Sequence, residues 1–270
     1  MKKLKVGIIG CGAIGTEVAT CSATVLKDKV ALVALYDTDK EKCAGLSREI
    51  KKDIVVDSAE TLFGKVDLVI ECASSAVSRE LVEKAIEMGK DIMVMSVGGL
   101  IDGEELLKKA ENKGTKVYIP SGAVCGIDAF KAAKQSKIDK VTLTTRKPPR
   151  GLEGAPYLKE KNIDINSIKN ETVIFVGSAR EAVRGFPKNV NVASLLSLAG
   201  IGASNTKVRI VTSPEYTKNT HEIEIIGDSG RITTKTENVP FEKNPKTSKL
   251  ASLSAIATLK GIAGSVRIGT

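Results

Sequence analysis

Short runs of apolar residues alternate with helix-like segments through the first 120 residues. The runs are LKVGIIG (4–10), VALVALYD (30–37), DIVVD (53–57), VDLVIECA (66–73), DIMVMS (91–96) and KVYIPS (116–121). Between them, residues 78–90 carry apolar side chains at helical spacing, and residues 102–114 form a similar segment that ends on a glycine. This alternation is typical of a parallel sheet with crossover helices. It predicts an α/β fold whose residues 1–120 form a Rossmann domain, a doubly wound parallel sheet.

The pattern changes after residue 121. A helix-like segment is followed by longer β-type runs at 140–148, 171–179, 206–214 and 221–237, the last of which contains a GDSG turn. An apolar helix is predicted within 189–203. We expect residues 121–240 to form an α+β catalytic domain with a largely antiparallel sheet. Residues 241–270 are expected to be helical and to pack back on the first domain.

A glycine-rich stretch, GCGAIG, follows the first predicted strand directly. In this context Gly10 permits a tight turn, Gly12 lets the backbone approach a pyrophosphate, and Gly15 allows close packing of helix on strand. Ala13 and Ile14 begin the helix, whose N-terminal N–H groups attract an anion. The motif therefore predicts binding of NAD or NADP.

Further cofactor contacts are expected where later strands end. Asp37 ends the second run, where its carboxylate can accept hydrogen bonds from the ribose hydroxyls of NAD, although a helix N-cap is the alternative. The neighbouring Thr38 and Lys40 could still tolerate the 2′-phosphate of NADP. At the ends of the fourth and fifth runs, the residues expected to line the nicotinamide side are Ala73, Ser74 and Gly98.

Composition narrows the class of ligand. Lys and Arg number 41 and Asp and Glu 32, a net charge of +9, but aromatic residues make up only 3%. The stacking surfaces of nucleic-acid binders are therefore missing, and an anionic small molecule explains the charge better. The five cysteines show no CxxC spacing, so we expect reduced thiols, no metal site and a cytoplasmic protein. No apolar run is long enough to predict a membrane partner.

His221 is the only histidine in the chain. In THEIEI, strand alternation places His221 with Ile223 and Ile225 on the inward face. On the residues alone, a packed core histidine is the ordinary interpretation. Upstream of it lies a predicted dinucleotide domain, and imidazole titrates near neutral pH, so a role in proton transfer is the alternative.

The chain resembles the L-aspartate dehydrogenase family along its whole length. The resemblance rests on GCGAIG (10–15), PSGAVCGIDA (120–129), FPKNVNVA (186–193) and NTHEI (219–223). It implies NAD(P)-dependent interconversion of L-aspartate with iminoaspartate, which hydrolyses to oxaloacetate and ammonia. It also implies that His221 is the catalytic acid/base, and that cofactor contacts come from Ala123 and from Asn191 or Asn189. We further expect a homodimer.

Alternatives stay open at this point. A homoserine-dehydrogenase-like oxidoreductase shares the two-domain plan, and a non-catalytic NADH-binding sensor would use the same glycines. A dicarboxylate substrate requires cations or helix N-termini at both ends. The basic residues near the predicted cleft are Arg146, Lys147, Arg180, Arg184 and Lys218, and the sequence does not choose among them. Residues 148–162, rich in Pro, Gly and charge, are expected to form a mobile loop over that cleft.

Overall fold

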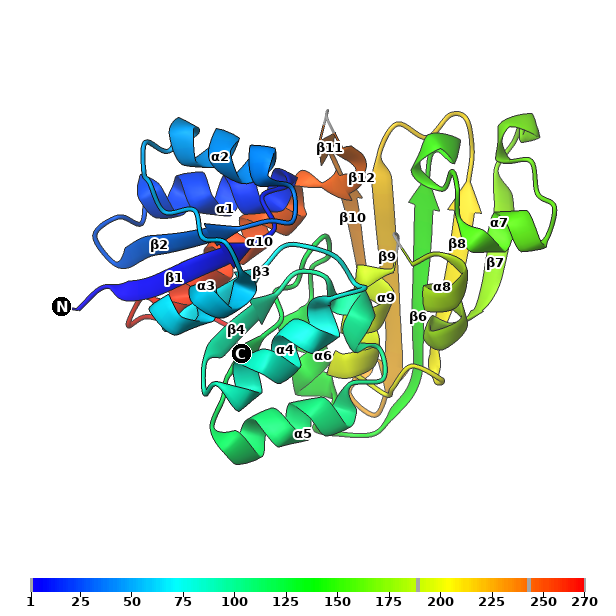
Figure 1. Ribbon diagram of the computed structural model, residues 1–270. Helices are drawn as coiled ribbons and strands as arrows, with labels where there is room; N and C mark the ends of the chain where they lie inside the picture. Colours follow the sequence, from blue (N-terminus) through cyan, green and yellow to red (C-terminus); the bar gives the residue numbers. More distant parts are fainter. Residues whose placement is uncertain (1, 188–189, 242–243, 270) are drawn as a thin grey trace. The chain divides into compact units, whose positions relative to one another are not determined.

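The computed structural model describes residues 2–187, 190–241 and 244–269, which divide into two compact units. Unit 1 comprises the described residues up to Pro120 together with Ser252–Ile268. Unit 2 comprises the described residues of Ser121–Ala251 and Gly269. Figure 1 shows both units.

Unit 1 is built on a five-stranded parallel sheet in the order β2-β1-β3-β4-β5. The strands are β1 (Leu4–Ile9), β2 (Val30–Tyr36), β3 (Leu68–Glu71), β4 (Asp91–Val94) and β5 (Val117–Tyr118). The order runs outward in both directions from β1, which confirms the doubly wound fold. The third predicted strand, 53–57, is wrong: this segment makes only an isolated bridge between Leu35 and Val55. Val55 is 40% exposed at the sheet edge, so the run is too little buried to extend the pairing.

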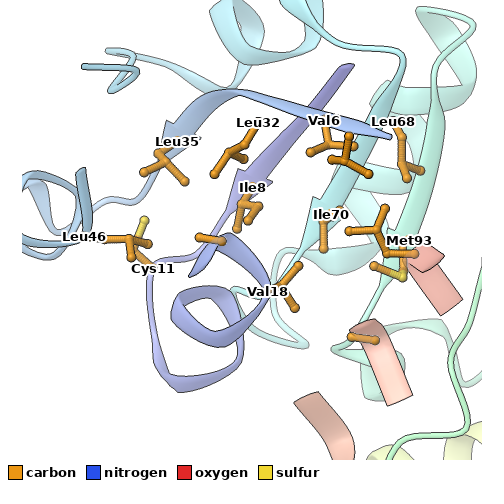
Figure 2. Packing of buried hydrophobic residues seen from close by; sticks show 14 of the residues in the cluster. Val6, Ile8, Cys11, Val18, Leu32, Leu35, Leu46, Leu68, Ile70 and Met93 are labelled. Atoms are coloured by element: carbon orange, nitrogen blue, oxygen red, sulfur yellow. The ribbon is translucent and has the colours of Figure 1, made fainter. Parts of the chain in front are cut away.

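Helices cover both faces of this sheet. One face packs against α1 (Ala13–Ala23), α2 (Lys40–Glu49) and the later part of α10 (Lys249–Ile262). The core on this face joins strand residues such as Ile8 and Ile70 to Val18 of α1 and Leu259 of α10, and Figure 2 shows the strand residues, α1 and α2 in this core. The other face carries α3 (Ala59–Lys65), α4 (Ser78–Glu87) and α5 (Glu104–Lys113). The predicted return of the C-terminal helix is thus observed within unit 1.

The two ends of α5 follow the local sequence signals to different degrees. Gly114 caps α5 in the left-handed conformation, with φ of 71°, as the sequence predicts. The first residue of α5 is Glu104, two residues later than expected. Its N-cap is Gly103, which has no side chain to cap the helix. A short 3₁₀ helix, η1 (Val97–Leu100), follows β4 and forms part of the loop at the carboxyl end of the sheet.

Unit 2 contains a five-stranded sheet in the order β10-β9-β6-β8-β7. The strands are β6 (Ile138–Lys147), β7 (Thr172–Ser178), β8 (Thr206–Thr212), β9 (Asn219–Gly227) and β10 (Gly230–Asn238). Three of the four pairings are antiparallel, but β6 and β8 run parallel, so the sheet is mixed. Gly227 and Gly230 close the predicted hairpin.

One face of the unit 2 sheet is covered by helices. Here α8 (Ala179–Gly185) and α9 (Asn191–Ala199) contact the strands and lie over the sheet in Figure 1, and α6 (Ile127–Ala133) packs against α9. A small two-stranded sheet, β11 (Pro240–Phe241) with β12 (Asn244–Ser248), precedes α10.

The segment 148–162, expected to be a mobile loop, contains short helices, and its mobility stays a prediction. It contains η2 (Pro149–Gly151) and α7 (Pro156–Glu160), and η3 (Ile165–Ser167) follows it. The apolar side chains of Leu152, Ala155 and Leu158 are buried. Its proline, glycine and charged residues are typical of a loop, whereas its spaced apolar residues are buried.

Candidate functional site

The three glycines of the GCGAIG turn have three different surroundings. Gly10 has φ of +99°, and an added Cβ would lie 2.5 Å from the backbone of Cys72, so only glycine fits. A Cβ on Gly15 would collide with the carbonyl oxygen of Gly10. A Cβ on Gly12, in contrast, would meet nothing within 4 Å. Two glycines therefore serve packing, and the third leaves open space at the helix N-terminus.

That open space has the character of an anion site. Gly12 is the N-cap of α1 and provides no side-chain capping bond. The first helical residues are Ala13 and Ile14, whose N–H groups belong to the first turn and have no partner within the helix. A pyrophosphate is the ligand that such a turn accommodates, with the helix dipole adding to the attraction. The residues present thus fit the phosphates of a dinucleotide.

Asp37 is tied to this turn. Its Oδ2 accepts a hydrogen bond of 2.7 Å from the backbone N–H of Cys11, and its Oδ1 accepts one of 2.9 Å from that of Asp39. The helix N-cap of α2 is Asp39, so the N-cap alternative for Asp37 is wrong. The carboxylate lies at the carboxyl end of β2, half-buried beside the glycine turn.

The loops after β3 and β4 hold the other predicted cofactor residues of unit 1. Ala73 and Ser74 are exposed in the loop between β3 and α4. Gly98 is buried within η1. Both loops lie at the carboxyl edge of the sheet, and the loop after β3 is next to the position between β1 and β3 where the strand order reverses.

His221 lies on the buried face of β9, with only 3% of its surface exposed. It stands opposite Thr145 of β6 and Thr236 of β10 in the strand register. Its Nδ1 is 3.0 Å from Thr145 Oγ1, so one ring nitrogen is held by a hydrogen bond. Burial and the nearby charge of Lys147 lower the pKa of His221 to about 3. The imidazole is therefore neutral at physiological pH.

Lys147 is the one of the five predicted cations that lies on this face. It is two residues beyond Thr145 on β6 and is 4% exposed, with Gly151 packed against its side chain. Arg146 points to the opposite face, where it pairs with Glu222 at 2.9 Å. Lys218 pairs with Glu237 at 3.8 Å. Arg146 and Lys218 line a polar pocket on that opposite face.

The remaining two predicted cations lie on α8. Arg180 donates to Ser204 Oγ at 2.9 Å, and Arg184 is exposed near the end of the helix. Neither is brought to the buried face of the sheet by a described contact. The structure thus reduces the five sequence candidates to Lys147 as the charge beside His221.

The PSGAVCG loop is fixed to the strand next to His221. The carbonyl oxygen of Ala123 accepts hydrogen bonds from Thr236 Oγ1 at 3.0 Å and from Asn238 Nδ2 at 2.8 Å. Since Thr236 stands opposite His221, Ala123 is held close to the histidine within unit 2. Asn191 begins α9 and is exposed, and Asn189 lies outside the described residues.

Sequence reasoning missed the residues that hold these groups. Thr145, Thr236 and Asn238 are ordinary strand residues in the sequence, and nothing in their spacing marks them. Strand alternation indicates which residues share a face, but which strands pair, and in which register, decides that these three meet His221 and Ala123.

The described residues contain no group of three His, Cys, Asp or Glu side chains arranged to hold a metal ion. All five cysteines are free thiols, and burial raises the pKa of Cys72 and of Cys43. No helix among the described residues is both long and apolar enough to cross a bilayer. The chemistry of the two units therefore comes from an anion-binding turn in unit 1 and a neutral imidazole beside a lysine in unit 2.

Comparison with known proteins gives the same picture for both halves. Residues 128–262 match the family model described as aspartate dehydrogenase, C-terminal. Residues 10–120 match the model described as homoserine dehydrogenase, NAD binding domain. The nicotinamide dinucleotides are thus the cofactors of this type of domain, in agreement with the glycine turn.

Individual relatives cover the whole chain. The chain is 47% identical to the L-aspartate dehydrogenase of Methanococcoides burtonii, over 99% of this chain and 100% of that one. Among solved structures, the aspartate dehydrogenase of Thermotoga maritima has a TM-score of 0.75 at 27% identity, covering 99% of this chain and 100% of that one. A homoserine dehydrogenase of Thiobacillus denitrificans has a TM-score of 0.65 at 14% identity, covering 97% of this chain and 74% of that one, and shares the fold alone.

Proposed function

The chain belongs to the L-aspartate dehydrogenase family, and from this premise we propose that it oxidises L-aspartate with NAD(P), with His221 as the acid/base. Aspartate loses a hydride from Cα and a proton from its amine, and water hydrolyses the resulting iminoaspartate to oxaloacetate and ammonia. The bound nicotinamide supplies the hydride acceptor. The observation that supports the assignment of His221 is its buried, neutral imidazole with one nitrogen held by Thr145.

The hydrogen bond to Thr145 engages Nδ1, which leaves Nε2 as the nitrogen available to the substrate. With Nδ1–H donating to Thr145 Oγ1, Nε2 carries the lone pair and takes the proton from the substrate amine or from water. Thr145 is a positioning residue in this scheme. A pKa of about 3 makes the free imidazole a weak base. A substrate carboxylate beside Lys147 opposes the lysine's contribution, so the pKa of His221 rises when substrate binds.

Cofactor contacts in the proposal come from both units. In unit 1 they are Gly10, Gly12, Ala13, Ile14, Gly15, Asp37, Ala73, Ser74 and Gly98. In unit 2 they are Ala123 and Asn191, with Asn189 as the alternative outside the described residues. The homodimer and the cytoplasmic location stay predictions, as do the absence of nucleic-acid and membrane partners. Light scattering of the purified protein tests whether it is a homodimer.

The activity is tested by following NADH absorbance with oxaloacetate and ammonia, and NAD(P) reduction with L-aspartate. We expect turnover in both directions. Turnover with homoserine and none with aspartate would favour the homoserine-dehydrogenase alternative. NADH binding without turnover of either amino acid would favour the sensor alternative.

Asp37 is expected to favour NAD over NADP. Asp37→Ala should weaken NAD binding far more than NADP binding, because only NAD has a free 2′-hydroxyl that can donate a hydrogen bond to this carboxylate. The loss of the bond from Cys11 weakens both cofactors equally, so the ratio of the two dissociation constants is the measurement. Asp39→Ala, which removes the neighbouring N-cap, is the matched control and should leave the ratio unchanged. An unchanged ratio in Asp37→Ala would contradict the assignment.

Lys147 is expected to bind a carboxylate of the substrate. Lys147→Met keeps the apolar stem and removes the charge, so the KM for aspartate should rise by about 10–100-fold, the equivalent of one lost charged hydrogen bond. The KM for NAD should stay within about twofold of wild type. Lys218→Met is the control, since Lys218 is half-exposed and paired with Glu237. An aspartate KM equal to that of the control would exclude Lys147 from the substrate site.

A further inference from the structure

Glu71 is a buried carboxylate that the proposed chemistry does not use. It is the last residue of β3 and has no exposed surface. Its two oxygens have separate partners: Oε1 accepts the N–H of Ala73 at 2.8 Å, and Oε2 accepts the N–H of Ser96 at 2.9 Å. One side chain therefore links the loop after β3 to the loop after β4.

A second hydrogen bond reinforces this link. Ser78, the first residue of α4, is fully buried and donates its Oγ proton to the carbonyl oxygen of Ser96 at 2.9 Å. Ser96 thus has its N–H and its carbonyl both held by buried side chains from the β3–α4 segment. The glycine turn lies alongside, because an added Cβ on Gly10 would contact the backbone of Cys72 and Ala73.

Burying a carboxylate is costly, and burial raises the pKa of Glu71. Hydrophobic packing of β3 does not require it, since the neighbouring strand residues Val69 and Ile70 are apolar. Two backbone N–H groups aimed at its oxygens offset that cost in part. They also fix the loops on both sides of it, which carry Ala73 and Gly98.

We propose that Glu71 is a positioning residue that holds these two loops in the arrangement that contacts the nicotinamide half of the cofactor. This rests on the proposed function, in which Ala73, Ser74 and Gly98 line the nicotinamide side. The adenosine half would bind beside Asp37 at the end of β2, which lies on the other side of β1 from β3, so we expect its binding to depend less on Glu71.

Glu71→Gln tests the role directly. Glutamine has the same shape but one acceptor oxygen, so its NH₂ group must face the N–H of Ala73 or that of Ser96, and one loop loses its anchor. We expect NADH affinity to fall about tenfold, as for one lost buried hydrogen bond, while affinity for ADP-ribose changes less than about twofold. Both are measured by calorimetry on the purified protein, without any enzymatic assay.

Two further variants keep the test decisive. Ser78→Ala removes the second bond to Ser96 and should show the same selective loss, even if Glu71→Gln does not fold. Leu62→Ala removes apolar volume beside Gly7 in the middle of β1 and controls for lower stability alone. It should change the two affinities by the same factor.

Equal losses for NADH and ADP-ribose in Glu71→Gln and Ser78→Ala would overturn the proposal and leave Glu71 a structural residue. Wild-type protein that binds NADH no more tightly than ADP-ribose would also overturn it, because the loops would then not contact the nicotinamide. Failure of aspartate turnover in a protein that shows the selective loss would count against the proposed substrate, and Glu71 would keep its role.

Discussion

Replacing His221 by alanine is expected to lower kcat for aspartate oxidation by about 10²–10⁴-fold, the usual contribution of a positioned acid/base. NADH affinity should stay near that of wild type, because the glycine turn and Asp37 belong to unit 1. The measurement is steady-state turnover per folded molecule, together with NADH titration and a thermal melt.

The structure also predicts a cost in stability for this variant. The imidazole is 3% exposed and bonded to Thr145, so alanine leaves a cavity and an unsatisfied hydroxyl. His221→Asn is the control, since its amide can still bond Thr145 but cannot transfer a proton at neutral pH. We expect asparagine to recover stability and no activity. Full activity in a folded His221→Ala enzyme would remove the proposed mechanism.

Replacing Gly12 by valine is expected to abolish NADH binding in a protein that remains folded. A Cβ at this position meets nothing within 4 Å, and the φ of −78° suits any residue. A side chain here is therefore compatible with the fold. The branched side chain instead fills the space that a phosphate enters. NADH titration by fluorescence and far-UV circular dichroism give the two readouts.

Gly64→Val is the matched control for this variant. Gly64 belongs to α3 of the same unit, and an added Cβ there also meets nothing within 4 Å. The same substitution at Gly64 should leave NADH affinity unchanged. Wild-type affinity in Gly12→Val would place the phosphates elsewhere. Loss of NADH binding in both variants would show that the substitutions act by destabilising unit 1, and would contradict the placement of the phosphates at Gly12.

The elements of both units were largely predictable, because apolar β-branched runs and helical spacing report on burial along one chain. The same signal wrongly predicted a strand at residues 53–57. This segment begins and ends with an aspartate, its Val55 is exposed, and it forms only one bridge. The signal also could not reveal that β6 pairs in parallel with β8, since alternation indicates which face is buried and carries no information on strand direction.

The candidate site was predictable only where one residue type is chemically unusual. A lone histidine and three spaced glycines stand out in a sequence. Thr145 and Glu71 do not, because a threonine in a strand and a glutamate at a strand end are common. Their importance arises from residues brought together across 76 and 25 positions of the chain, respectively. The roles of the site residues themselves stay predictions until the variants are measured.

The return of α10 to unit 1 has a consequence for biosynthesis. Residues up to Pro120 leave the ribosome before those of unit 2, yet the core over β1 and β3 includes Ala255 and Leu259, which are translated after almost all of unit 2. Unit 2 is almost continuous in sequence and has its full set of contacts earlier. The dinucleotide fold, although N-terminal, is therefore the last to be completed. A nascent chain that stalls before residue 252 lacks the part of this core that α10 supplies, so apolar surface beside α1 and α2 stays exposed, which favours binding by chaperones.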